Sequence, residues 1–442
     1  MNKLKPYDKY QPVQYDYVKE LPYDWKLLPN IAIFQERIEK GFVDEELLSV
    51  TIGKGVIRQK ELDKKDSSTL DKSKYLLIHP GDLVYSMRFR QGASGYSIYK
   101  GIVSPACTVL KPKRNIKINP KYFFYMFRTG FYKNYVERFA YGIADGQIPL
   151  RYKDFKRIYS IAPPLETQNS IVEYLDRKTK QIQKFISKKE RLIELLEEKR
   201  NKAIFSFITF GNTKINTIQT SIEWQLNTPI HWKEYKLKYL LSKPVSGQWG
   251  DEPNNSDNDI ICVRIADYQS LNISTGNLTK RNIKANPNII LLKGDLLIEK
   301  SGGGEKTPVG RVVIFNKDFR AVTSNFISKT TPNSKLIISK YLLYIFKVIN
   351  DVRWNVKSIK QTTGIQNIDI GHYLDNKVYI PDLSEQKNIL KLIERKISKV
   401  DRLISKAQSE ITKIKEYQES LITNIVTGKL KVPTHTKAEC NE

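Results

Sequence analysis

Two short stretches of the sequence contain residue types that are used in nucleotide chemistry. The glycine-rich run Gly302–Thr307 looks like a phosphate-binding loop, but Glu305 stands where the Walker pattern requires a lysine, and no helix pattern follows. Ala162–Leu165 contains the only Pro-Pro pair, without the preceding Asn or Asp and the following aromatic residue that adenine amino-methylation needs. We therefore interpret the first stretch as a hairpin loop and the second as the start of a helix.

A third stretch resembles a metal-dependent nuclease site, which needs clustered carboxylates and a lysine. Asp295, Glu299 and Lys300 could hold Mg²⁺ beside a scissile phosphate. The similar segment that begins at Asp82 has Ser86–Met87 instead of the second carboxylate and the lysine. We therefore favour the interpretation that Asp82 and Asp295, each of which follows a glycine, help to form a turn.

Cysteine and histidine residues are too dispersed for a zinc site, a disulfide framework or a nucleophilic triad. They are Cys107, Cys262, Cys440, His79, His231, His372 and His435. This usage predicts a reducing, cytoplasmic setting. No apolar run is long enough to span a membrane, so no membrane association is expected. The formal charge of +27 indicates an anionic partner, most simply nucleic acid.

The elements that must position any site are duplicated. Four patterns occur twice in the same order, as the pairs Pro22–Trp25 and Pro229–Trp232, Gly81–Val84 and Gly294–Leu297, Lys121–Phe127 and Lys340–Phe346, and Leu165–Gln168 and Leu383–Gln386. Four matches in register indicate two copies of one unit of about 215 residues.

Each copy follows the same sequence of predicted elements. Short strands come first, a helix follows at 119–138 or 339–350, and a further strand at 155–161 or 376–380 ends at proline. A long helix then closes each copy.

Apolar residues on the two long helices alternate by four and three, which is a heptad seam. The seam consists of Leu175, Ile182, Ile186, Ile193, Leu196 and Ala203 in the first helix, and of Ile393, Ile397, Val400, Ile404, Ile411, Ile414 and Leu421 in the second. Lys189 and Arg200 interrupt the first seam. Because neither helix can bury its stripe alone, we expect the two to pair as one coiled coil of roughly 60 Å. We predict the antiparallel arrangement, which puts the two domains at opposite ends, over a parallel one, in which residues 213–382 would have to return along the rod. The alternative is that each helix folds back on its own domain.

The repeated arrangement resembles the specificity subunit of Type I restriction-modification enzymes. The residues that carry this resemblance are the two Pro…Leu-x-x-Gln helix starts at 163–168 and 381–386, the Pro-x-x-Trp and Gly-Asp turns, and the helix exit Thr427–Lys429. The first helix departs from the pattern, since it has Glu166–Gln168 without a Glu-Gln pair and ends through Phe210–Gly211.

The resemblance implies an α+β fold with two tandem mixed α/β target-recognition domains and pseudo-twofold symmetry. The expected parts are a first recognition domain at 1–164, a long spacer helix at 165–212, a second recognition domain at 213–381, a second spacer helix at 382–428, and a tail at 429–442. Each domain would read one half of a bipartite site in double-stranded DNA. Two methyltransferase (modification) subunits and restriction/translocase subunits would be the partners. S-adenosylmethionine, ATP and Mg²⁺ would be bound by those partners, with no catalytic residue, metal or cofactor in this chain.

Base recognition uses Arg or Lys for guanine and Asn or Gln for adenine, and small polar donors bind phosphate. Such residues gather in predicted loops of both copies: Lys54, Arg58, Lys60, Arg88, Arg90, Gln91, Gln147, Arg151 and Lys153 in the first, and Gln248, Lys300, Ser301, Lys306, Lys360, Gln361, Gln366 and Asn367 in the second. These are the predicted DNA-binding residues.

Two other classes remain as alternatives. One is a basic coiled-coil adaptor that binds proteins without reading DNA, and the other is a self-contained restriction enzyme. The missing catalytic motifs disfavour the enzyme, and the duplicated domains rich in base-reading residue types disfavour the adaptor.

Overall fold

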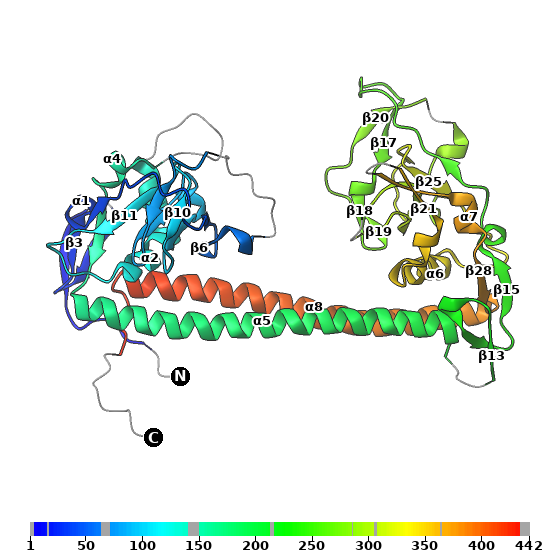
Figure 1. Cartoon of the computed structure of the whole chain (residues 1–442). Helices are drawn as coiled ribbons and strands as arrows, with labels where there is room; N and C mark the ends of the chain where they lie inside the picture. The colour runs from blue at the N-terminus through cyan, green and yellow to red at the C-terminus, as the bar shows by residue number, and fades with distance from the viewer. Residues whose placement is uncertain are drawn as a thin grey trace. The chain divides into compact units, whose positions relative to one another are not determined.

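The computed structural model describes residues 4–15, 17–62, 71–139, 150–212, 216–284, 286–304, 307–362 and 365–433. The chain forms two compact units, called unit 1 (Met1–Lys189 with Ser409–Glu442) and unit 2 (Glu190–Gln408). Each unit combines one α+β domain with half of each long helix, α5 (Leu165–Phe210) and α8 (Leu383–Val426). In each unit the two helices run side by side beneath the domain (Figure 1).

The domain of unit 1 is built on the antiparallel sheet β4-β11-β8-β9, which packs against α2. Its strands are β1 (Tyr10–Tyr15), β2 (Val18–Pro22), β3 (Lys26–Pro29), β4 (Phe34–Glu36), β5 (Leu48–Thr51), β6 (Gly55–Arg58), β7 (Leu76–Ile78), β8 (Leu83–Tyr85), β9 (Ser94–Tyr96), β10 (Gly101–Val103), β11 (Thr108–Pro112) and β12 (Tyr159–Ala162). Its helices are α1 (Asn30–Ile33), η1 (Gln59–Glu61), η2 (Phe89–Gln91), α2 (Pro120–Arg128), α3 (Gly130–Val136), η3 (Glu137–Phe139) and α4 (Tyr152–Phe155).

The domain of unit 2 repeats this plan with the sheet β16-β25-β21-β23, which packs against α6. Its strands are β13 (Thr217–Gln219), β14 (Asn227–Pro229), β15 (Lys233–Lys236), β16 (Val245–Ser246), β17 (Asp259–Val263), β18 (Tyr268–Gln269), β19 (Asn272–Ile273), β20 (Lys280–Asn282), β21 (Leu296–Glu299), β22 (Ser301–Gly302), β23 (Val312–Ile314), β24 (Ala321–Thr323), β25 (Ile327–Thr330), β26 (Ile359–Thr362), β27 (Ile365–Ile368) and β28 (Lys377–Ile380). Its helices are η4 (Glu223–Gln225), η5 (Leu237–Leu240), η6 (Ile265–Asp267), η7 (Pro287–Ile289), α6 (Ser339–Asp351), η8 (Trp354–Ser358) and α7 (Ile370–Leu374).

Two predicted elements of unit 1 differ from the structure. The helix expected at 119–138 breaks at Thr129, which has extended backbone angles and whose hydroxyl accepts a hydrogen bond from Tyr132 N at 3.2 Å. A side chain that caps a new helix competes with continuation of the old one. The strand expected at 155–161 was also wrong in part, because residues 152–155 form α4 and pairing with β3 begins at Tyr159.

Antiparallel pairing of the long helices is confirmed within each unit. In unit 1, Lys189 of α5 pairs with Glu410 of α8 at 2.6 Å. In unit 2, Arg200 of α5 pairs with Asp401 of α8 at 2.9 Å. Earlier on α5 in unit 1, Tyr174 interacts with Tyr417, and at the end of α5 in unit 2, Gly211 lies against Glu385. Within each unit, therefore, the partner number on α8 falls as the number on α5 rises. Both cations that interrupt the predicted seam form ion pairs between the helices.

All the predicted seam positions are buried or half-buried. Leu175 and Ile393, which lie beneath the domains, are almost fully buried. Ile193, Leu196, Ile411 and Ile414 are only half-buried because a pair of helices covers one face of each helix. None of the helices in the described part of the chain is long and apolar enough to cross a membrane.

The repeated glutamine explains how each long helix is fixed to its domain. Gln168 is 2 % exposed, and its amide accepts from Asn119 N and donates to Pro163 O, both at 2.8 Å. Gln386 is fully buried, accepts from Ile338 N at 2.9 Å and donates to the carbonyls of Leu336 and Pro381. In both units, therefore, this side chain ties the helix start to the segment that leads into α2 or α6.

The repeated Pro-x-x-Trp turn receives the far end of the other long helix. A side chain at Gly428, which ends α8, would meet Pro22 at 2.6 Å and Trp25 at 3.2 Å. A side chain at Gly211, which ends α5, would meet Trp232 at 3.1 Å. Both glycines have positive φ, so the sequence places glycine where the backbone turns left-handed against a buried indole.

Candidate nucleic-acid interface

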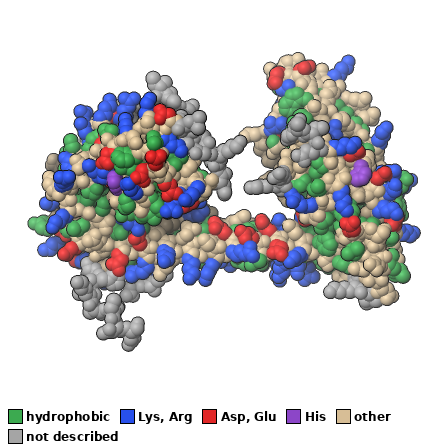
Figure 2. Space-filling view, viewed as in Figure 1, with side chains coloured by type: hydrophobic (Ala, Val, Ile, Leu, Met, Phe, Trp, Pro, Cys, Tyr) green, Lys and Arg blue, Asp and Glu red, His purple; other side chains and the backbone are tan. Residues whose placement is uncertain are grey.

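Basic side chains are distributed over both units. Figure 2 shows Lys and Arg across the visible face of each domain and along the helices, with Asp and Glu interspersed. Charge density alone therefore does not locate an interface, and the arrangement of the loops must do so.

In unit 1 the structure brings four predicted residues together. Lys54 is exposed at the turn of the β5–β6 hairpin, and a bridge between Ile52 and Ala93 places this hairpin beside η2. The three residues at η2 are exposed as well, namely Arg88, Arg90 and Gln91. Lys54 and these three residues form the basic surface of unit 1. Within it, Arg90 pairs with Glu137 at 2.6 Å.

Other predicted residues of unit 1 lie elsewhere. Arg58 and Lys60 both pair with Glu46, at 3.1 and 2.8 Å, and Arg58 also stacks over Tyr99. Arg151 and Lys153 are exposed on or next to α4, which lies on a different side of unit 1 from β6 (Figure 1). Gln147 lies outside the described residues. The eight predicted positions of the first copy that the structure describes therefore do not make one surface.

In unit 2 a three-stranded sheet, β22-β27-β26, gathers most of the predicted residues. Ser301 lies opposite Asn367, Lys360 lies opposite Asn367 on the other side, and Gln361 lies opposite Gln366. Lys306 lies outside the described residues. Strands distant in sequence thus place polar residues side by side.

The contacts of this sheet determine which of its side chains can still bind a ligand. Lys360 is 75 % exposed and pairs with Asp369 at 2.7 Å. Gln366 is half-buried, and its Oε1 accepts from Val309 N at 3.2 Å, so part of its amide is already used within the domain.

Lys300 connects this sheet to a second loop. Its Nζ donates to Ser246 Oγ, and its backbone N–H donates to Phe326 O at 2.8 Å. Partial burial lowers the pKa of Lys300. Gln248, exposed two residues after Ser246, is thereby held near the same surface.

Sequence reasoning missed a hollow of about 390 Å³ beside Lys300. It is lined by Trp249, Arg264, Ile265, Ala266, Ser324, Asn325 and Phe326. Trp249 is 37 % exposed and Phe326 is 52 % exposed, which is unusual for large aromatic side chains. The available signal was an aromatic residue inside a short turn, in Gly247–Gly250 and in Ser324–Phe326.

The aspartates of the two Gly-Asp turns act within the fold. Asp82 accepts from His79 N at 2.8 Å and binds Arg37. Asp295 accepts from Leu292 N at 2.7 Å and binds Lys329 at 3.3 Å.

Glu299, the other carboxylate considered for a metal, is fully buried and binds Arg311 at 2.9 Å. This hydrogen bond raises the pKa of Arg311. Each carboxylate of the stretch considered for a metal thus has its own cationic partner, and the turn interpretation of the Gly-Asp pairs is confirmed.

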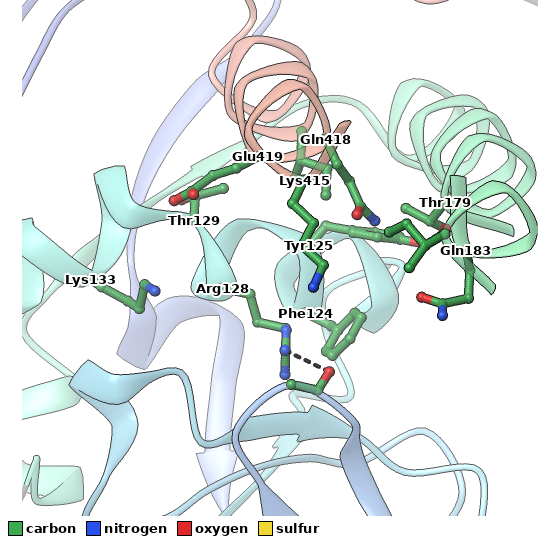
Figure 3. Close-up of a pocket in the computed structure, with 13 residues that line it drawn as sticks. Phe124, Tyr125, Arg128, Thr129, Lys133, Thr179, Gln183, Lys415, Gln418 and Glu419 are labelled. Carbon is green, nitrogen blue, oxygen red and sulfur yellow. Dashed lines mark hydrogen bonds between the residues drawn. The ribbon is translucent and has the colours of Figure 1, made fainter. Parts of the chain in front are cut away.

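A groove of about 570 Å³ with a mixed polar and apolar lining lies in unit 1 where α2 and α3 meet the two long helices (Figure 3). Lys415 and Gln418 of α8, Gln183 of α5, and Arg128 and Lys133 of the domain line it. Arg128 donates to the carbonyls of Gly53, Gly92 and Ser94, at 2.8, 3.4 and 2.9 Å. Burial, which removes water from this guanidinium, lowers the pKa of Arg128.

The family model described as "Type I restriction modification DNA specificity domain" matches the chain twice, at residues 39–203 and 229–413. The chain therefore belongs to this family, as the sequence resemblance predicted.

Individual relatives are distant in sequence. The chain is 21 % identical over 327 residues to the Type I restriction enzyme StySPI specificity subunit of Salmonella potsdam, covering 73 % of this chain and 68 % of that protein. A solved chain from a study of assembly and conformational transition of the type I R-M system matches with a TM-score of 0.67 and 14 % identity, covering 93 % of this chain and 99 % of that one. The HsdS subunit from Thermoanaerobacter tengcongensis matches with a TM-score of 0.49 and 15 % identity, covering 93 % and 98 %.

Proposed function

We propose that this chain reads a bipartite target in double-stranded DNA, with one half-site contacted by each domain. The observation that carries the proposal is that one chain contains two copies of a DNA specificity domain, each with exposed basic and amide side chains on its loops. Arg, Lys, Asn and Gln on loops are the residue types that read base edges in the major groove.

The proposal is tested by selecting duplexes from a random library with the full chain and the subunits that co-purify with it. We expect a motif of two short sequences separated by unspecified base pairs, and an affinity that falls steeply with salt. Lys54→Glu should weaken recognition of one half, and Lys300→Glu recognition of the other. Selection of a single continuous motif, or of none, would contradict the proposal.

The paired helices act in this proposal as a spacer between the half-sites. A heptad inserted into both α5 and α8 keeps the seam in register and adds about 10 Å, or roughly three base pairs of B-DNA. The enriched motif should then keep both half-sites and gain about three base pairs between them. The matched control inserts the heptad into α5 alone, which disrupts the pairing. An unchanged spacer in the double insertion would rule out this role.

The catalytic steps are assigned in this proposal to partners: two methyltransferase subunits that use S-adenosylmethionine and restriction/translocase subunits that use ATP and Mg²⁺. Equivalent exposed apolar residues on the helices support two similar docking places. Phe185 of α5, in unit 1, is 40 % exposed, and Leu403 of α8, in unit 2, is 44 % exposed. They correspond when the helices are aligned on Gln168 and Gln386.

Phe185→Glu and Leu403→Glu should each reduce the amount of co-purifying methyltransferase, and the double variant should abolish it. Because both side chains are exposed, the thermal unfolding temperature should change little. Lys184→Glu, at an exposed neighbouring position, is the control for added negative charge. Full recovery of partners by the double variant would show that they dock elsewhere.

A further inference from the structure

The hollow in unit 2 contains an arginine with a fixed orientation. Arg264 Nη2 lies 2.9 Å from Asp267 Oδ1, and Arg264 Nε lies 3.3 Å from Asp267 Oδ2. The backbone N–H of Arg264 also donates to Asp267 Oδ2 at 2.8 Å, and the Asp267 side chain is only 5 % exposed. A buried carboxylate thus holds one edge of the guanidinium.

The opposite edge of this guanidinium is available to a ligand. The hydrogen bonds found among the described residues engage Nε and Nη2 of Arg264 and leave Nη1 without an acceptor. The side chain is 36 % exposed. Nη1 and the second hydrogen of Nη2 therefore form a pair of parallel donors at the hollow.

The walls of the hollow are held as firmly as the arginine. The guanidinium of Arg281 lies 4.6 Å above the Trp249 ring and also donates to Gly250 O. At Gly247 a Cβ would lie 2.0 Å from Thr323 O, so glycine allows this loop to lie directly against β24. The loop that carries Trp249 is therefore fixed against this strand.

We propose that Arg264 reads a guanine in the half-site of unit 2, with Trp249 and Phe326 as the apolar walls beside the base edge. Two parallel donors match the O6 and N7 acceptors of guanine, and apolar side chains favour a thymine methyl at a neighbouring position. Asp267 is a positioning residue, because it acts only through Arg264. The inference rests on the proposed DNA-reading function and adds the base and the residue.

Unit 1 contains a different loop at the corresponding place. The turn between β10 and β11 is Ser104–Cys107, where unit 2 has Ser324–Phe326 between β24 and β25. It contains neither an aromatic residue nor an amide side chain. Unit 1 therefore lacks the apolar wall that Phe326 provides in unit 2, and we expect the two half-sites to differ at the base beside it.

The test replaces guanines one at a time with 7-deazaguanine, which lacks the N7 acceptor, in the duplex selected by the full chain with its co-purifying subunits. For the unaltered chain, 7-deazaguanine at one position of the second half-site should lower the affinity for the duplex about tenfold. Arg264→Ala should lower affinity for the unmodified duplex about tenfold to a hundredfold, and 7-deazaguanine at that position should cause no further loss. Arg264→Lys should lose less affinity than Arg264→Ala and keep part of the 7-deazaguanine effect, because a lysine can still donate to N7 but lacks the pair of parallel donors.

Arg320→Ala, which removes an exposed charge at the opposite end of β24, is the matched control and should leave the 7-deazaguanine effect intact. Unchanged reading of the first half-site by Arg264→Ala demonstrates that the variant is folded. Equal weakening for every duplex by Arg264→Ala would identify a phosphate contact and overturn the inference. If Arg264→Ala selects the same bipartite motif as the unaltered chain, the inference is overturned and the proposed function stands. If the unaltered chain selects no bipartite motif, the proposed function is overturned.

Discussion

The junction between domain and helices differs between the two units although its framework is the same. In unit 2, Arg200 and Asp401 form an ion pair between the helices, and Lys347 of α6 reaches Asn201 at 3.0 Å. When the helices are aligned on their buried glutamines, the equivalent residues of unit 1 are Gln418 and Gln183, which line the open groove. The same backbone arrangement thus carries an ion pair between the helices in unit 2 and an open groove at the equivalent place in unit 1.

This comparison separates the contacts that maintain the repeat from those that are free to diverge. The buried glutamine, the Trp against a helix-ending glycine, and the aspartate of the Gly-Asp turn occur in both units with equivalent partners. The exposed side chains around them differ in type and charge. A protein that reads two different half-sites would need this combination of an invariant framework and variable surfaces.

The largest expected difference between the units is at the two aspartates. Asp295→Ala leaves Lys329, whose side chain is 10 % exposed, without a carboxylate and should cost about 3–5 kcal/mol. Asp82→Ala should cost less, about 1–3 kcal/mol, because Arg37 keeps Glu39. Urea unfolding followed by tryptophan fluorescence measures both. Asp295→Asn keeps a hydrogen-bond acceptor, so its loss of unfolding free energy should be smaller than that of Asp295→Ala. Equal losses for the two alanine variants would contradict this ranking.

An intermediate effect is expected at the two buried glutamines. Gln386→Ala removes the side-chain partner of Ile338 N and of two carbonyls. Gln168→Ala removes the side-chain partner of Asn119 N and of one carbonyl. Each variant should lose about 1–3 kcal/mol of unfolding free energy, with the larger loss for Gln386→Ala. Hydrogen exchange should accelerate at the amides of Ile338 and Asn119, respectively. Gln181→Ala, at an exposed position of α5, should leave both amides protected. If exchange at these amides stays slow in the glutamine variants, the glutamine is not what fixes the helix start.

The smallest effect is expected from exchanging the junction residues. Arg200→Gln with Asp401→Gln should destabilise the chain by about 0.2–1 kcal/mol, because the pair is partly exposed. Gln418→Arg with Gln183→Asp should stabilise it by a similar amount and narrow the groove of unit 1. A double-mutant cycle at low and high salt isolates each coupling. A coupling energy that does not fall with salt would argue against an electrostatic origin.

The sequence by itself determined the duplication, the elements of each copy, the position of both long helices and the seam that joins them. These properties depend on periodicity and on local turn chemistry, which are readable in one dimension. Even so, the local competition at Thr129, where a capping hydroxyl overrides an apolar helix pattern, was not resolved by periodicity alone.

Only the tertiary structure decided which loop residues meet. Ser301 and Asn367 become neighbours through strand pairing across a long stretch of chain, and Arg264, Trp249 and Phe326 line one hollow from three separate loops. Arg58 and Lys60, in contrast, are engaged by Glu46. These contacts between distant loops depend on long-range hydrogen bonds and on the close packing of one backbone segment against another, as at Gly247. Residue spacing in the sequence does not predict them.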